Sequence, residues 1–211
     1  KIEGYDVSHF SGDNAVASCV VFSKQGPQKK NYRLFNIPAE LSGNDIGSLE
    51  HVLERRIKYY ADPGLKPDVI LIDGGKNQLN FVNTIINKSD HHDIKVISIV
   101  KGSKRVRATE TIISEDGIIE LDKYSKAFLI LQEIRDESHR FAIRAQRNKK
   151  RKKISQSELD SIKGIGEILK KRLLTKFKSI KKIKSADIKE LMTVEGINER
   201  IAKEILDKFK N

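Results

Sequence analysis

The sequence predicts an α/β domain, with a mixed sheet flanked by helices, followed by a small all-α domain. Over residues 1–143, strand-like segments come first and then alternate with segments of helical periodicity. Residues 154–211 contain instead a duplicated helix–turn–helix unit. A lysine- and arginine-rich stretch, residues 144–153, separates the two parts.

The first part begins with three expected strands and a helix. Residues 2–10, 15–22 and 31–37 have strand-like composition, and turn sequences at 12–14 and 26–27 separate them. Asn44 is the expected N-cap of a helix whose apolar spacing extends from Ile46 to Ile57, and Pro63 and Gly64 are expected to end it.

A second group of elements completes the expected sheet. The short apolar run at 68–72 predicts a central strand that is buried on both faces. After Gly74 and Gly75 we expect, in order, a helix that contains the apolar residues Leu79, Val82, Ile85 and Ile86, a strand at 94–100, a hairpin at 105–121 and a long helix at about 122–150. Phe128, Leu131, Ile134 and Phe141 form the apolar side of the long helix.

The all-α part is recognised by its repeat. Residues 159–177 and 191–209 align with an offset of 32, which pairs apolar residues with apolar residues and Gly164 with Gly196. Two such units that share an apolar face form one compact domain.

The net charge of +12 is unevenly placed. Residues 1–143 hold 20 basic and 20 acidic residues, residues 144–153 hold 7 basic residues and no acidic ones, and residues 154–211 hold 14 basic and 9 acidic. This distribution favours phosphate binding by the C-terminal part over a merely solubilising or targeting role. Whether residues 144–153 form a flexible tether or the end of the long helix is left open by the pattern.

Other features exclude several classes of protein. The single cysteine, Cys19, lies in an apolar stretch, so a disulfide framework is excluded and a buried side chain is expected. The sequence contains no apolar run long enough to cross a membrane and no signal peptide, and we expect an intracellular, cytoplasmic protein. Because Lys1 falls directly in strand-like sequence, we expect the chain to be a fragment of a longer protein.

The hairpin repeat carries the first chemical signal. Gly164 and Gly166 allow a tight turn, and the helix that begins there presents unpaired N–H groups and a positive dipole end that suit a phosphate. Lysines nearby add positive charge; the competing interpretation is that the glycines only cap a helix. In the second copy Asn198 stands where the first copy has a glycine, and asparagine tolerates the left-handed region. The residues expected to contact DNA are Lys163, Gly164, Gly166, Lys170, Lys171, Gly196 and Asn198, with Lys76 from the first part.

Two aspartates carry the second signal. Asp6 interrupts a strand, and Asp73 ends the apolar run at 68–72 and precedes two glycines. A carboxylate at a sheet position is costly to bury unless it is paired or binds a cation. Two of them within reach of each other would form an oxygen-rich site for Mg²⁺ or Mn²⁺, although each alone is also typical of a turn.

Three longer segments resemble one family. Residues 2–12 (IEGYDVSHFSG), 67–79 (PDVILIDGGKNQL) and 135–147 (RDESHRFAIRAQR) are similar to signature segments of UvrC, the incision subunit of the bacterial UvrABC excinuclease. The repeat that follows resembles the tandem helix–hairpin–helix domain of DNA-repair nucleases. Gly4 and Asn77 depart from the UvrC pattern.

The resemblance implies an RNase H-like fold and a divalent-metal-dependent endonuclease. Asp6, Asp73 and His139 match the family's metal site, and a fourth carboxylate position near the start of the first helix would fall on Asp45, where the segment SGNDIGSL matches the family loosely. His139 would be a metal ligand or a proton carrier; the sequence does not separate these roles. His9 is expected to be supporting or structural, His91 and His92 to be solvated, and Arg105 and Arg107 to be candidates for phosphate contact.

The implied function is the 5′ incision of damaged DNA during nucleotide excision repair. The implied partners are damaged double-stranded or bubble DNA and a UvrB–DNA complex whose contact segment lies outside this chain; no membrane partner is expected. The alternative is a non-catalytic module with a nuclease-like fold that only binds DNA. A structural protein without nucleic-acid contact fits the charge distribution poorly.

Overall fold

A computed structural model describes the backbone of residues 1–8, 15–101 and 110–210, and the chain divides into two compact units, Lys1–Gln146 and Arg147–Asn211. The described strands are β1 (Ile2–Ser8), β2 (Val16–Ser23), β3 (Gly26–Pro27), β4 (Arg33–Asn36), β5 (Val69–Asp73), β6 (Lys95–Lys101), β7 (Glu110–Ser114) and β8 (Gly117–Ile119). The described α-helices are α1 (Asp45–Ile57), α2 (Lys76–Asn87), α3 (Lys126–Asp160), α4 (Glu167–Phe177), α5 (Ile180–Ser185), α6 (Ile188–Met192) and α7 (Glu199–Lys210).

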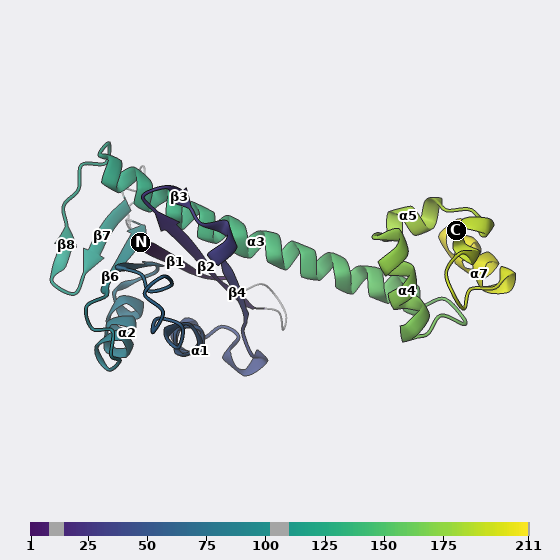
Figure 1. Cartoon of the computed structure of the whole chain (residues 1–211), viewed down its shortest axis with the longest axis horizontal. Helices are drawn as coiled ribbons and strands as arrows, with labels where there is room; N and C mark the ends of the chain where they lie inside the picture. The colour runs from purple at the N-terminus through teal and green to yellow at the C-terminus, as the bar shows by residue number, and fades with distance from the viewer. Residues whose placement is uncertain (9–14, 102–109, 211) are drawn as a thin grey trace. The chain divides into compact units, whose positions relative to one another are not determined.

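One mixed sheet forms the centre of the first unit, as expected. Its order is β3-β2-β1-β5-β6-β7-β8, and β4 also pairs with β2. The central strands β1, β5 and β6 are parallel, and the remaining pairs are antiparallel. Helices α1 and α2 cover one face of the sheet and α3 covers the other (Figure 1).

Side chains along β1 point alternately to the two faces of the sheet, so some meet α3 and others meet α1. Gly4 faces α3, and a Cβ at this position would come within 2.4 Å of the Ile134 side chain. The departure at Gly4 therefore has a packing reason, because α3 lies too close to β1 for a larger residue. Glu3, one residue earlier, points to the opposite face and meets Arg56 of α1.

Several predicted elements are confirmed and two have different bounds. Strand β5 is buried at Ile70–Ile72, and Asn44 caps α1 by accepting a hydrogen bond from the Gly47 N–H at 2.9 Å. The third expected strand, residues 31–37, is shortened to β4, because a 3₁₀ turn (Lys29–Asn31) occupies its start. The turn expected at residues 26–27 lies instead at residues 24–25, and Gly26–Pro27 forms the short strand β3, which ends where Pro27 has no N–H to continue the ladder. Helix α1 ends at Ile57, before the prolines, and the chain then turns so that Tyr60 enters the core.

Helix α3 is longer than the apolar pattern predicts. It continues to Asp160, so the backbone of residues 144–153 is helical rather than extended. This stretch lacks glycine and proline and is rich in lysine and arginine, which favour helix, but it carries no apolar stripe. The amphipathic signal therefore fades although the helix continues.

Two further predictions concern Cys19 and the histidine pair. Cys19 is fully buried in the core of the first unit, and burial raises the pKa of its thiol well above the ordinary value. His92 is exposed, as expected, whereas His91 is half-buried and makes an edge-type ring contact with Tyr60, with centroids 5.6 Å apart. No helix in the described part of the chain has the length and apolar character needed to span a membrane.

The second unit is built from the predicted repeat. Paired positions of the two copies form its core, among them Leu159 with Leu191 and Leu173 with Ile205. Both hairpin glycines have a positive φ, 92° at Gly164 and 90° at Gly196. A Cβ on Gly164 would contact Ile201, and a Cβ on Gly196 would contact Leu169, which is the equivalent residue of the other copy. Each hairpin thus rests on the helix of its partner copy.

Candidate active site and nucleic-acid interface

Asp6 lies near the carboxyl end of β1 and faces α3. It is 7% exposed, and its Oδ2 accepts a hydrogen bond of 2.7 Å from the Ser8 hydroxyl. The Nδ1 atom of His139 lies 3.4 Å from the same oxygen, while the imidazole side chain is 55% exposed. The strand and α3 therefore bring together two of the predicted residues, 133 positions apart in the sequence.

Two hydrogen bonds fix this part of α3 against the sheet. The buried Ser18 hydroxyl of β2 donates to the carbonyl of Ser138 at 2.8 Å, one residue before His139. The Gln146 amide donates to the Ser8 carbonyl at 2.9 Å. These two bonds, at Ser138 and Gln146, hold the part of α3 that carries His139 in place on the sheet.

Asp73 is the last residue of β5, the parallel neighbour of β1. Tyr5 pairs with Ile72, so Asp6 and Asp73 are the next residues on adjacent strands and share a face of the sheet. The buried Ser98 hydroxyl of β6 donates to the Ile72 carbonyl at 3.1 Å and also to the Gly74 carbonyl. This hydroxyl therefore fixes the backbone on both sides of Asp73.

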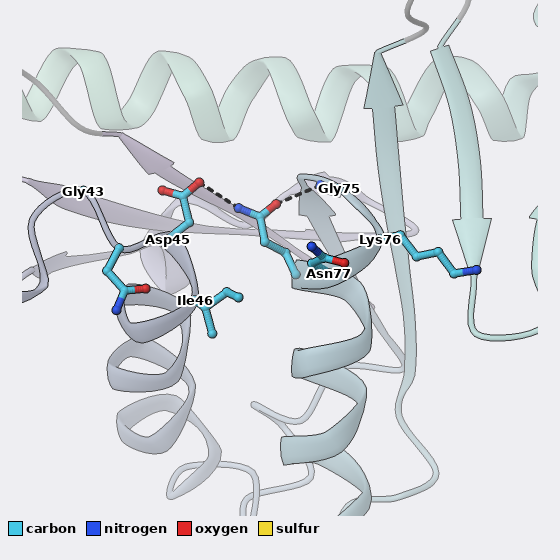
Figure 2. A pocket seen from close by; sticks show the side chains of 8 residues that line it. Gly43, Asp45, Ile46, Gly75, Lys76 and Asn77 are labelled. Carbon is cyan, nitrogen blue, oxygen red and sulfur yellow. Dashed lines mark hydrogen bonds between the residues drawn. The ribbon is translucent and has the colours of Figure 1, made fainter.

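Asp45 is the first residue of α1 and borders a separate open cavity of about 600 Å³. The cavity lies between the first turns of α1 and α2 and is lined by Gly43, Asn44, Asp45, Ile46, Gly75, Lys76, Asn77 and Gln78. The Asp45 Oδ2 accepts a hydrogen bond of 2.9 Å from the Gln78 amide (Figure 2). The side chain of Lys76 is directed away from Asp45 in this view (Figure 2).

The predicted site residues do not form one metal-binding cluster in the described part of the chain. Among residues 1–8, 15–101 and 110–210, no group of three or more His, Cys, Asp or Glu side chains stands in a position to hold a metal ion. Asp6, Asp73 and His139 lie at one end of β1 and β5, and Asp45 lies at the start of α1. Their roles stay predictions. His9, Arg105 and Arg107 lie outside the described residues.

Six supporting residues were not singled out from the sequence: Ser8, Ser18, Ser98, Ser138, Gln146 and Gln78. Ser8 had a usable signal, because residues two apart on a strand share a face and a hydroxyl there can bond Asp6. Gln78 also had one, because glutamine three residues after an N-cap is typical of a capping box. The contacts of Ser138 and Gln146 depend on the three-dimensional packing of α3 and carry no local signal.

The first hairpin leaves the start of α4 without a side-chain cap, and its role in phosphate binding stays a prediction. Gly166 is the N-cap of α4 and provides no side chain to accept from the first-turn N–H groups. Lys163 and Lys171 are exposed beside it. Lys170 differs, since it is only 4% exposed and its ammonium group lies between Asp160 and Glu167, which raise its pKa. Its charge is therefore balanced inside the unit, and a DNA contact by Lys170 stays a prediction.

The second hairpin is organised differently. The sequence suggested that Asn198 could replace a glycine because asparagine tolerates the left-handed region. Asn198 does not adopt that conformation, because Gly196 supplies the positive φ of the turn. Asn198 instead caps α7, and its side-chain oxygen accepts from the Ile201 N–H at 3.0 Å. Arg172 of α4 donates to the Glu195 carbonyl at 2.9 Å, which ties the second turn to the first copy.

Comparison with known families agrees with both units. Residues 1–143 match the family model described as the UvrC RNase H endonuclease domain, and residues 157–211 match the model described as a SAM-like helix-hairpin-helix tandem. The first unit is thus an RNase H-like endonuclease domain, and the second is a tandem helix–hairpin–helix domain. The chain belongs to the UvrC family.

Curated relatives support the same assignment over most of the chain. UvrABC system protein C of Legionella pneumophila (strain Paris) is 40% identical over 185 residues, which is 87% of this chain and 30% of that protein. The corresponding protein of Saccharophagus degradans is 38% identical, again over 87% of this chain and 30% of the relative. The chain therefore spans about 30% of the length of the relatives it matches.

About half of the chain aligns, at low TM-scores, with two solved endonuclease structures. Endonuclease V of Ciona intestinalis, crystallised with DNA that contains an inosine, aligns with a TM-score of 0.37 and 18% identity, covering 50% of this chain and 47% of that chain. Human ENDOV aligns with a TM-score of 0.35 and 21% identity, with the same coverage.

Proposed function

We propose that this chain is a divalent-metal-dependent DNA endonuclease that makes the 5′ incision in damaged DNA during nucleotide excision repair. Its substrate would be damaged duplex or bubble DNA in a complex with UvrB, and the UvrB contact would lie elsewhere in the full-length protein. The observation that carries the proposal is the placement of Asp6, with His139 3.4 Å away and Asp73 at the adjacent position of the next strand.

The donor set supports Mg²⁺ or Mn²⁺ as the metal. Two carboxylates provide the hard oxygen ligands that these ions prefer, and an imidazole nitrogen completes the set. Asp6 is nearly buried, and its oxygen lies close enough to His139 Nδ1 for the two to share one cation. A divalent ion there would supply Lewis-acid polarisation of the scissile phosphate.

The protein's own side chains would orient the site residues and accept a proton from the attacking water. Ser8 fixes the rotamer of Asp6, and Ser18 fixes α3 beside it, so the polar groups are oriented before substrate arrives. His139 would bind the cation through Nδ1 or accept the proton of the attacking water. The first hairpin, with Lys163 and Lys171 exposed, would hold the DNA backbone without reading its sequence.

The direct test is nicking of bubble DNA in the presence of Mg²⁺ or Mn²⁺. Asp6→Asn and Asp73→Asn should abolish nicking and leave DNA affinity unchanged, because the expected DNA-binding residues lie mostly in the second unit. Asp116→Asn, in the exposed turn between β7 and β8, is the matched control and should nick normally. Nicking that survives in both site variants would refute the assigned site.

The two roles of His139 are separable in the same assay. If His139 binds the metal, His139→Ala should weaken Mn²⁺ binding measured by calorimetry and slow nicking. If it carries a proton, Mn²⁺ affinity should be retained while nicking slows.

The competing function is a non-catalytic module that only places other proteins on DNA. The observation that favours it is that, within the part of the chain that the structure describes, no three metal-binding side chains form a closed cluster. This alternative predicts salt-sensitive DNA binding without divalent-ion-dependent nicking. The wild-type nicking assay distinguishes it from the endonuclease.

A further inference from the structure

We propose that Gln78 is a positioning residue that holds the Asp45 carboxylate in a fixed place relative to the turn after Asp73. This inference rests on the proposed function and on Asp45 being part of the incision site. Neither the sequence pattern nor the family resemblance assigned a role to Gln78.

The side chain of Gln78 makes two hydrogen bonds in opposite directions (Figure 2). Its Oε1 accepts from the Gly75 N–H at 2.8 Å, and its Nε2 donates to the Asp45 Oδ2 at 2.9 Å. One amide thus joins the first turn of α2, two residues after Asp73, to the first residue of α1. A glutamate could make only the first bond, because a carboxylate cannot donate.

The glycine before this turn provides an independent observation. A Cβ on Gly74 would lie 1.7 Å from the Gln78 Oε1 and 2.7 Å from its Cδ. Gly74 is not among the described glycines with a positive φ, so its backbone does not itself require glycine. A side chain at this position would therefore displace the end of Gln78 from its bonds to Gly75 and Asp45.

The bridge matters chemically because Asp45 lies at an open cavity, and the hydrogen bond from Gln78 restricts the rotamers that its carboxylate can adopt there. A donated N–H fixes one carboxylate oxygen and thereby the direction of the other. Partners of this kind around metal-binding groups typically contribute about 10- to 100-fold in metal affinity or activity. We therefore expect Gln78 to act on the rate of incision through Asp45.

The simpler interpretation is that Gln78 only caps α2. Gly75 is the N-cap of this helix and Gln78 is the third residue within it, which is the capping-box position. Glutamate serves equally well at this position in a capping box. Gln78→Glu therefore separates the two roles, because it keeps the cap on Gly75 and replaces the bond to Asp45 with repulsion between two carboxylates.

The experiment compares Gln78→Glu and Gly74→Ala with Asn80→Ala, an exposed substitution on α2 outside the cavity. Gly74→Ala should displace the flexible end of Gln78 while the fold is retained. For the wild type and each variant of the whole 211-residue chain, we would measure the rate of bubble-DNA nicking as a function of Mg²⁺ concentration. We would also measure DNA affinity, Mn²⁺ affinity by calorimetry, and the midpoint of thermal unfolding.

We expect Gln78→Glu and Gly74→Ala to nick about 10- to 100-fold more slowly at fixed Mg²⁺. Their DNA affinity and thermal midpoint should match those of Asn80→Ala, and their Mn²⁺ affinity or their Mg²⁺ requirement should shift. A wild-type nicking rate in Gln78→Glu would overturn the inference, as would a loss of activity that only follows a loss of thermal stability.

The result also separates this inference from the proposed function. If the wild type nicks, Asp6→Asn does not, and Gln78→Glu equals the wild type, only the positioning role fails. If the wild type does not nick with any divalent ion, the proposed function fails and the positioning role in incision fails with it.

Discussion

The buried glutamate of β1 allows the packing of the first unit to be tested quantitatively. Glu3 is 0% exposed, and its carboxylate accepts hydrogen bonds from the Arg56 guanidinium, from the Tyr60 hydroxyl at 2.6 Å and from the Tyr5 hydroxyl at 2.7 Å. Burial alone would lower the pKa of Arg56, but its hydrogen bonds to Glu3 and the charge of Glu3 outweigh burial and raise it. The ion pair is therefore enclosed in the core, with side-chain exposures of 3% at Arg56 and 0% at Glu3.

Replacing Arg56 by methionine keeps much of the side-chain volume but leaves the Glu3 carboxylate without a cation. Breaking a buried pair in this way costs about 3–5 kcal/mol of unfolding free energy, because one charge stays buried without compensation. The double variant Glu3→Leu with Arg56→Met removes both charges. It should be more stable than Arg56→Met alone, since the Tyr5 and Tyr60 hydroxyls lie 3.1 Å apart and can bond each other.

Urea unfolding followed by tyrosine fluorescence measures these effects in the intact chain. All five tyrosines lie in residues 1–146 and the chain has no tryptophan, so the signal reports the first unit alone. A cost below about 1 kcal/mol for Arg56→Met would refute the reasoning, because that is the range of a solvent-exposed pair. A double variant as destabilised as the sum of the two single variants would refute it as well.

Three further predictions concern charge, backbone and pH. Lys163→Met should weaken DNA binding and reduce the salt dependence of the binding constant by about one released counterion. Lys170→Met should change DNA binding little, because two carboxylates already balance the charge of Lys170. Fluorescence anisotropy at several salt concentrations measures both effects. Gly196→Ala should destabilise the second unit by about 1–3 kcal/mol, because Gly196 has a positive φ and the new Cβ would lie 2.7 Å from the Leu169 side chain. Thermal circular dichroism measures the change, and Gly166→Ala, where a Cβ would meet open space, is the control. The free energy of unfolding of the first unit should fall as pH rises above about 8.5, because burial raises the pKa of Cys19 in the folded state and the unfolded thiol loses its proton first. Urea unfolding at about pH 7 and about pH 9.5 measures this loss, which should be smaller in Cys19→Ala than in the wild type.

The sequence was most informative where local chemistry decides the structure. The apolar run that ends at Asp73 predicted a buried strand, and Asn44 predicted the start of α1, because each signal lies within a few residues. The repeat predicted the core of the second unit, since matched apolar positions in two copies can be buried only against each other. The family segments then indicated Asp6, Asp73 and His139 as one site.

The rest depended on contacts between distant residues. Apolar periodicity could not show that α3 extends to Asp160, because a charged helix has no apolar stripe to detect. Lysine composition could not show that Lys170 is enclosed, because its partner Asp160 is brought near by the hairpin turn. Gln78 could be recognised as a cap from its spacing, but its bond to Asp45 spans 33 residues and follows only from the packing of α1 beside α2.

Strand β1 carries its two acidic side chains on opposite surfaces. Glu3 and Asp6 are three positions apart, an odd number, so one belongs to the internal scaffold and the other to the candidate site. Deleting a single residue between them would turn both carboxylates toward the same layer and deprive one layer of its acidic group. Changes in length within this strand should therefore be far less tolerated than changes of residue type at its half-buried ends, Ile2 and Val7.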